Sequence, residues 1–162
     1  MKVSLVQMNT QNNKAENLAV AADLIEKAVK ADNPDLVVLP EYFAFLGENP
    51  QDMHESGEEF PGGEIYTLLS GLAKKHAITL HAGSIVEKEG NRFYNSTLVF
   101  GPDGEQIARY RKIHLFDVDT PNGISYRESD SVARGEEVVT YQVGDKTVGC
   151  GICYDIRFPE LF

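Results

Sequence analysis

The stretch that decides how this chain folds is Gly151-Ile152-Cys153-Tyr154-Asp155-Ile156-Arg157-Phe158-Pro159-Glu160. It places Cys153 where an apolar strand over residues 146–152 must stop and a helix must begin, because Pro159 has the backbone angle of a first helical turn. A thiol on such a turn projects from the end of a sheet, where the free N–H groups of the helix start favour the thiolate and can stabilise an oxyanion. The stretch therefore predicts a covalent nucleophile. A small cysteine buried as a hydrophobic side chain fits this stretch about equally well.

Two more chemically active side chains follow predicted strands. Residues 35–39 form a continuous apolar run typical of a strand covered on both faces, and Glu41 follows directly after the proline that ends it. A strand over residues 105–112 delivers Lys112. Open α/β sheets place their sites beyond the C-terminal ends of strands. Alone, the glutamate could cap a helix and the lysine could be solvated, but with Cys153 they predict one shared site.

Three motifs, in this order, resemble the nitrilase (carbon–nitrogen hydrolase) superfamily. They are Leu39-Pro40-Glu41, Tyr110-Arg111-Lys112-Ile113-His114-Leu115-Phe116-Asp117 and Cys150-Gly151-Ile152-Cys153-Tyr154-Asp155-Ile156-Arg157-Phe158-Pro159-Glu160-Leu161. The resemblance places the catalytic residues of the family on Glu41, Lys112 and Cys153, and a second site glutamate on Glu128. It implies an α/β fold, a four-layer αββα sandwich in which a mixed sheet carries helices on one face. Residues 1–162 would form the N-terminal part of that domain, truncated after the nucleophile turn.

The resemblance is strongest to the amidase branch that includes ω-amidases and deaminated glutathione amidases. It implies hydrolysis of a non-peptide carbon–nitrogen bond in a small carboxylate-bearing amide, with release of ammonia through a cysteine thioester. Cys153 would attack the carbonyl, Glu41 would move the proton, and Lys112 with the N–H of Tyr154 would hold the oxyanion. No cofactor or metal is implied, and a homo-oligomer is expected. The alternatives are a nitrile or N-carbamoyl hydrolase of the same family, or an inactive truncated fragment.

Other side chains near the three motifs have less certain roles. Tyr42 and Phe116 either line the pocket or simply pack, and Tyr154 belongs to the same group of candidates. His114 is expected to be a structural residue behind Lys112 rather than a catalyst. Asn95 is expected to make structural hydrogen bonds rather than contact substrate.

The spacing of Cys150 and Cys153 also matches a CxxC redox pair, which remains a minor alternative. Residues three apart in a strand point to opposite faces, so a strand running to Ile152 would put Cys150 in the core. A zinc site is weaker still, because one CxxC supplies only two ligands. The histidines show no recurrent ligand spacing: His76, His81 and His114.

The composition suits one globular domain, with 42% hydrophobic and 25% charged residues. The net charge of −10 argues against nucleic acids and anionic membranes as partners, since no basic cluster occurs. Residues 1–8 are too short and strand-like for a signal peptide. Two cysteines without such a signal indicate a reducing, cytoplasmic location.

Hydrophobic periodicity predicts helices that begin near Asn13, capped with Glu16, and at Gly62-Gly63, where the buried stripe is Ile65, Leu68, Leu69 and Leu72. Residues 117–137 are expected to form a loop. The expected strands span residues 2–8, 35–39, 78–87, 92–100, 105–112, 138–143 and 146–152. Because the second half of the sandwich is absent, Leu5, Val37 and Leu39 are expected to lack cover, and the chain by itself is expected to show little activity.

Overall fold

A mixed six-stranded sheet organises the computed structural model, which describes residues 1–162. Its strands are β1 (Val3–Leu5), β2 (Leu36–Val38), β3 (Thr79–His81), β4 (Ile85–Glu89), β5 (Arg92–Phe100) and β6 (Gln106–Arg111). Strands β1, β2 and β3 are parallel, and β5 runs antiparallel to β3, β4 and β6. Because β3 and β4 pair with successive parts of the same edge of β5, they lie end to end.

The remaining elements are three α-helices, two short hairpins and three 3-10 turns. The helices are α1 (Lys14–Asp32), α2 (Pro50–Ser56) and α3 (Gly63–His76), and the hairpins are β7 (Asp117–Asp119) with β8 (Ser125–Arg127) and β9 (Thr140–Val143) with β10 (Lys146–Gly149). The 3-10 turns are η1 (Glu128–Asp130), η2 (Cys153–Arg157) and η3 (Pro159–Leu161). None of the helices combines the length and the apolar character that a membrane crossing requires.

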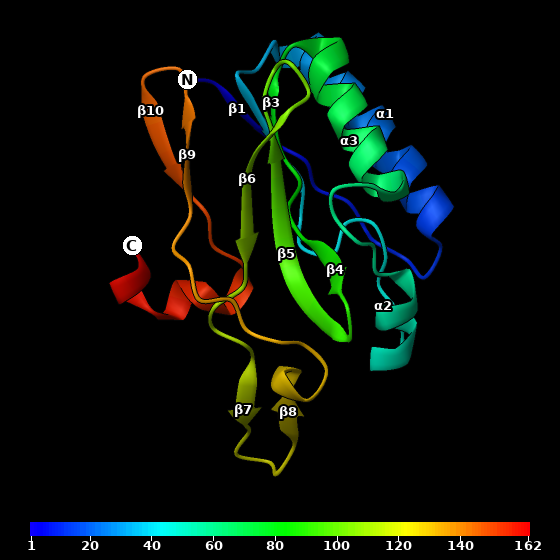
Figure 1. Cartoon of the computed structure of the whole chain (residues 1–162), viewed down its shortest axis with the longest axis vertical. Coiled ribbons are helices and arrows are strands. Elements are labelled where there is room, and N and C mark those ends of the chain that lie inside the picture. The colour runs from blue at the N-terminus through cyan, green and yellow to red at the C-terminus, as the bar shows by residue number, and fades with distance from the viewer.

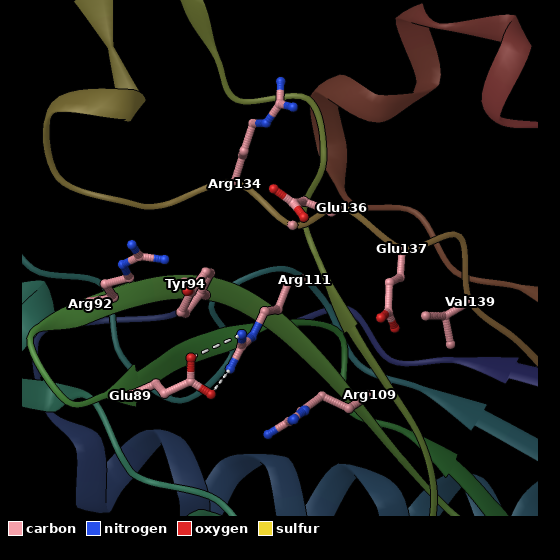
Figure 2. Close-up of a pocket in the computed structure, with 10 residues that line it drawn as sticks. Glu89, Arg92, Tyr94, Arg109, Arg111, Arg134, Glu136, Glu137 and Val139 are labelled. Carbon is pink, nitrogen blue, oxygen red and sulfur yellow. Dashed lines mark hydrogen bonds and ion pairs between the residues drawn. The ribbon is translucent and has the colours of Figure 1, made fainter.

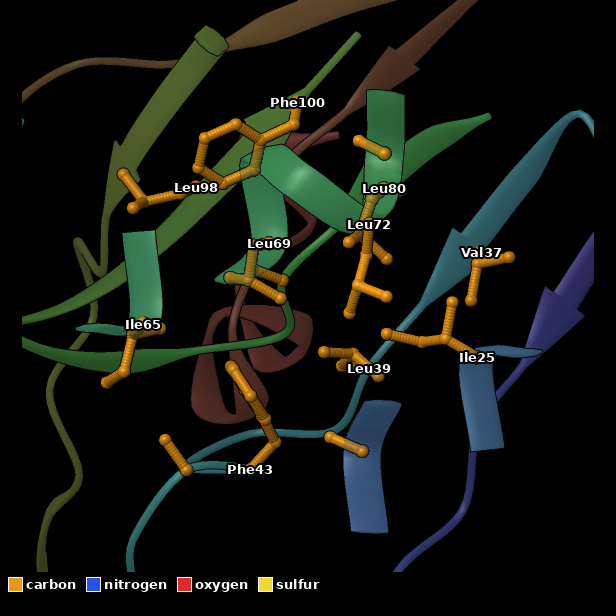
Figure 3. Packing of buried hydrophobic residues seen from close by; sticks show 14 of the residues in the cluster. Ile25, Val37, Leu39, Phe43, Ile65, Leu69, Leu72, Leu80, Leu98 and Phe100 are labelled. Carbon is orange, nitrogen blue, oxygen red and sulfur yellow. The ribbon is translucent and has the colours of Figure 1, made fainter. Parts of the chain in front are cut away.

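Helices α1 and α3 cover one face of the sheet (Figure 1). The predicted cap of α1 is confirmed: the Asn13 side chain accepts a hydrogen bond from the N–H of Glu16 at 3.2 Å. The two helices and the sheet enclose a core of 17 buried residues, including Ile25, Leu69 and Phe100 (Figure 3). This packing fixes the strand ends that precede the candidate site residues.

The β9–β10 hairpin covers the opposite face of the sheet (Figure 1). Tyr141 and Ile152 from this part of the chain pack against Val99 and Tyr110 of the sheet in a second cluster of eight buried residues. Two β-layers and one helical layer are therefore present. The predicted fold class, an α/β protein with a mixed sheet and helices on one face, is confirmed.

The expectation that three strand residues would lack cover is correct only for Leu5, which is 79% exposed. It is wrong for Val37 and Leu39, which are buried beneath the two helices. In the predicted stripe of α3, Leu68 is only partly buried and Ala73 is buried instead.

Several predicted elements differ from the structure because close tertiary contacts override local patterns. The expected strand at 78–87 breaks at Gly83, where φ is +56° and a side chain would collide with the carbonyl oxygen of Pro40. Residues 117–137 contain the β7–β8 hairpin and η1 rather than only a loop, and α2 was not predicted. Pro159 does begin a helical turn, but the segment after Cys153 is 3-10 rather than α-helical.

Candidate active site

Glu41, Lys112 and Cys153 line one pocket of about 440 Å³. Glu41 lies just beyond the end of β2, Lys112 follows β6 directly, and Cys153 begins η2 after β10. The pocket is thus built from three segments that are far apart in the chain. The structure brings together the three side chains that the sequence predicted to share a site.

Lys112 is a buried cation held by two carboxylates. It is 2% exposed, and its Nζ lies 2.9 Å from Oε2 and 3.2 Å from Oε1 of Glu128 and 3.5 Å from Oε1 of Glu41. Burial by itself would lower the pKa of Lys112, but the hydrogen bond and charge of Glu128, together with the charge of Glu41, raise it above its ordinary value. The amine is therefore charged at neutral pH.

Asn95 joins the two glutamates from the middle of β5. It is fully buried, and its Nδ2 donates to Oε1 of Glu41 at 2.8 Å and to Oε1 of Glu128 at 3.5 Å. The backbone carbonyl oxygen of Asn95 also accepts the backbone N–H of Lys112 at 2.9 Å. The prediction of a hydrogen-bonding role is confirmed, but sequence reasoning missed that the partners are the site carboxylates themselves.

Cys153 is exposed on a turn with an unusual backbone conformation. Its φ is +49°, in the left-handed region, and Tyr42 across the pocket has a φ of +50°. Such conformations cost on the order of 1–3 kcal/mol in a residue other than glycine and concentrate at functional turns. The surrounding structure must therefore hold the thiol where it is.

The expectation that the helix start would favour the thiolate is wrong. Burial and the negative charge of Glu41 raise the pKa of the Cys153 thiol, and these effects outweigh the opposing charge of Lys112. A short 3-10 turn also offers a weaker dipole than an α-helix. The thiol is thus protonated at rest, and a base is needed to activate it.

The other candidate residues divide between the pocket wall and the layer behind it. Tyr42, Phe116 and Glu128 line the pocket, and burial raises the pKa of Tyr42, so its hydroxyl stays neutral. Tyr154 does not line it but packs edge-on against Phe116, with ring centroids 5.1 Å apart.

His114 lies outside the pocket and contacts the nucleophile turn rather than Lys112. Its Nδ1 lies 2.8 Å from Oδ1 of Asp155, and its ring stacks on Phe158 with centroids 3.8 Å apart. The predicted position behind Lys112 is therefore wrong, although the histidine is structural in its contacts. Asp155 lies in the motif that contains Cys153, but the sequence by itself suggested no role for it. The signal that could have found it is a carboxylate two residues after the predicted nucleophile, between Tyr154 and Ile156.

A second pocket is lined mostly by charged side chains, and Figure 2 shows the ion pair between Arg111 and Glu89 within it. Arg111 donates to Oε1 of Glu89 at 2.7 Å and to Oε2 of Glu87, which is buried, at 3.0 Å. Its guanidinium also lies 3.8 Å above the ring centroid of Tyr94. The pocket holds no nucleophile. Its ion pairs anchor the β4–β5–β6 end of the sheet next to Lys112.

No group of three or more histidine, cysteine, aspartate or glutamate side chains is arranged to hold a metal ion. Cys150 is buried and Cys153 is exposed, as expected for residues three apart at the end of a strand. Burial also raises the pKa of Cys150 to about 11. The two thiols therefore differ sharply in their access to solvent.

Known proteins resemble this chain over nearly all of its length. A family model described as carbon-nitrogen hydrolase matches residues 2–162. Hydrolase C26A3.11 of Schizosaccharomyces pombe is 39% identical over 166 residues, which cover 99% of this chain and 49% of that protein. Omega-amidase NIT2 of Danio rerio is 40% identical over 163 residues, which cover 99% of this chain and 57% of that protein.

A solved structure is similar over the same range. Nit3 of Saccharomyces cerevisiae, described as a member of branch 10 of the nitrilase superfamily, matches with a TM-score of 0.87 at 36% identity. The match covers 99% of this chain and 58% of that one. This chain spans about half the length of the curated relatives it matches. It belongs to the carbon–nitrogen hydrolase family of the nitrilase superfamily.

Proposed function

We propose that this chain carries the catalytic residues of an amidase, which hydrolyses a small carboxylate-bearing amide and releases ammonia. The observation that carries the proposal is the placement of a thiol, a carboxylate and a buried ammonium on one pocket wall. Amide hydrolysis needs these three functions: a nucleophile, a proton carrier and a positive charge for the oxyanion. The relatives named omega-amidase support an amide as substrate.

Glu41 is the proton carrier in this proposal. Its contacts with Asn95 and Lys112 both use Oε1, which leaves Oε2 available to the thiol. The thiol proton passes to Glu41 as Sγ of Cys153 forms a bond to the amide carbon. The C–N bond then breaks, and the nitrogen takes the proton from Glu41 and leaves as ammonia. Water then attacks the thioester carbon and gives a proton to Glu41. The C–S bond breaks, Glu41 returns that proton to the sulfur, and the product acid leaves as a carboxylate after it loses its own proton to solvent.

In this proposal Lys112, which lines the pocket, holds the oxyanion that forms on the carbonyl. The backbone N–H of Tyr154 is the second donor, since it directly follows the lining residue Cys153 even though Tyr154 is not itself part of the lining. The raised pKa of Lys112 keeps the ammonium charged without help from the substrate. The Tyr154 N–H lies at the start of η2, where backbone donors have no partner within the turn. Glu128 holds Lys112 through both of its oxygens and so orients the ammonium.

The carboxylate of the substrate would meet the one other permanent cation of the pocket lining, Arg127 on β8. Its guanidinium pairs with Asp119 of β7 at 2.8 and 2.9 Å, so the hairpin holds it in place. Leu46, Met53 and Phe116 supply an apolar wall for the carbon chain between the two polar ends of the substrate.

Ammonia release across a substrate panel tests the proposal. The panel contains ω-amides of keto acids, deaminated glutathione, N-carbamoyl compounds and nitriles. It is assayed with the chain by itself and with an extended version that continues through the second half found in the relatives. We expect turnover of carboxylate-bearing amides by the extended version and little by the chain alone, because this chain spans only about half the length of its relatives and the rest of the pocket wall would come from the second half.

Matched variants assign the roles in that assay. Cys153→Ala should abolish thioester formation, and Lys112→Ala should lose roughly 2.7–4 kcal/mol of transition-state stabilisation. Turnover of nitriles alone would refute the amidase assignment. Comparable turnover per site by the chain alone would show that this half is a complete enzyme.

A further inference from the structure

Asp155 is a fully buried carboxylate whose acceptor capacity is saturated. Its Oδ2 accepts from the hydroxyl of Tyr110 at 2.6 Å and from the N–H of Ile152 at 2.9 Å. Its Oδ1 accepts from the N–H of His114 at 2.9 Å and from Nδ1 of the same residue at 2.8 Å. A carboxylate has about four acceptor sites, and burying one is costly unless such partners surround it.

The carboxylate is ionised in this setting. Burial would raise the pKa of Asp155, but the hydrogen bonds from Tyr110, Ile152 and His114 outweigh burial and lower it. Because the ionised group can only accept, Nδ1 of His114 must carry the proton that it shares with Asp155.

The donors come from two segments that carry different parts of the site. Ile152 immediately precedes Cys153, and Asp155 lies in the same turn. Tyr110 and His114 lie on either side of Lys112, and the Tyr110 hydroxyl also accepts the N–H of Ile113 at 3.2 Å. One buried charge therefore ties the backbone before the nucleophile to the backbone around the lysine.

The nucleophile turn needs such an external anchor. Cys153 occupies the left-handed region, and η2 spans only five residues. A 3-10 segment of this length has poor hydrogen-bond geometry and does not hold a strained residue by itself. A displacement of about 1 Å between reacting groups can reduce a rate by roughly a hundredfold.

We propose that Asp155 is a positioning residue that holds Cys153 in its strained conformation and fixes its position relative to Lys112. It touches neither substrate nor the reacting atoms, because it is fully buried and outside the pocket lining. The proposal rests on the proposed amidase site, but its consequence for the thiol can be measured without any substrate.

The first test is the pH dependence of Cys153 alkylation by iodoacetamide, followed by mass spectrometry on the 162-residue chain and its Asp155→Asn variant. In the native chain the thiol pKa is raised by burial and by Glu41. Asparagine has nearly the same shape as aspartate, but its NH2 group would face the hydrogen-bond donors that now surround the carboxylate. The η2 turn should therefore loosen. The midpoint of alkylation should then fall toward that of a solvated thiol, about 8.5.

Cys150 provides an internal control for global unfolding. It is buried below the same turn, so it should stay unlabelled in Asp155→Asn if only the turn has moved. Asp145→Asn, an exposed change in the β9–β10 turn, should leave the profile unchanged. Tyr110→Phe removes one of the four donors and should shift the midpoint in the same direction by a smaller amount.

In the extended version, Asp155→Asn should lower kcat by roughly a hundredfold while leaving KM within about twofold. An unchanged alkylation midpoint with Cys150 protected would overturn the proposal. Labelling of Cys150 together with Cys153 would also overturn it, since the role would then be general stability. If the native protein proves to have no amidase activity, the proposed function fails, whereas the alkylation result still decides the role of Asp155.

Discussion

The ammonium of Lys112 donates hydrogen bonds to both oxygens of Glu128, at 2.9 and 3.2 Å. This bidentate contact keeps a nearly inaccessible amine charged, because burial by itself would lower its pKa. Glu128 also accepts the N–H of Phe116 at 2.6 Å, so the carboxylate is fixed from the backbone side. The position of the cation is thus set before any substrate binds.

The first prediction concerns the replacement Glu128→Gln. Without the carboxylate, burial of Lys112 is opposed mainly by the charge of Glu41, so the lysine pKa should fall. The alkaline limb of the kcat profile in the extended version should move to lower pH, with a loss of turnover of roughly 10²–10³-fold. Glu160→Gln, on the exposed turn η3, is the charge-matched control. If the alkaline limb of the Glu128→Gln profile stays at the pH of the native enzyme, Glu128 does not keep Lys112 charged.

The second prediction concerns the two cysteines. At pH 8, brief treatment with iodoacetamide should modify Cys153 and spare Cys150, whose pKa is about 11. Cys150→Ser should perturb packing and leave turnover per folded molecule nearly intact. Peptide mapping of the alkylated chain makes the measurement. Modification of Cys150 with Cys153 left free would overturn the assignment, and loss of activity in Cys150→Ser would favour the redox alternative.

The third prediction follows from the buried His81, whose Nδ1 lies 3.0 Å from the Tyr141 hydroxyl and so links the two sheets. Burial lowers the pKa of His81 to about 4, below the unfolded value of about 6.5. Its contribution to stability is therefore fully present above pH 6.5 and is lost as the pH falls toward 4. The loss amounts to about 3 kcal/mol at most, from a shift of about 2.5 pKa units.

Urea unfolding at pH 7.5 and pH 4.5 measures this effect. Carboxylates elsewhere also titrate in this range, so the informative quantity is the difference between the native chain and His81→Gln. The native chain should lose more free energy of unfolding on acidification than the variant. Equal losses in the two chains would mean that His81 does not titrate as a buried neutral group.

The fourth prediction concerns recognition of the substrate carboxylate by Arg127. In the extended version, Arg127→Gln should raise KM for a carboxylate-bearing amide by roughly ten- to a hundredfold, since a charged hydrogen bond contributes roughly 1.5–3 kcal/mol. Turnover of a neutral amide of similar length should change little. Asp119→Asn removes the ion pair that positions the guanidinium and should raise KM by a smaller amount, because Arg127 itself remains. Equal effects of Arg127→Gln on both substrates would place the carboxylate elsewhere.

Local sequence patterns were enough to predict several of the helices and strands and the three residues of the candidate site. The cap at Asn13, the apolar run before Pro40 and the helix start at Gly62-Gly63 each depend on residues close in the chain, so their elements could be predicted. Glu41, Lys112 and Cys153 each follow a strand that the sequence predicted, which is why the shared pocket was predictable too.

Only the tertiary structure decided how the site side chains are held. Asn95 lies 54 residues from the Glu41 that it contacts, and Asp155 lies 45 residues from Tyr110. Local spacing does not encode which buried polar atoms will meet, because each such pair is selected by the packing of distant strands. The same holds for the pKa of Cys153, which depends on burial and on the charges of Glu41 and Lys112. The sequence by itself determined the chemical groups of the site, and tertiary packing decided their geometry and charge, since burial and long-range contacts exist only in the folded chain.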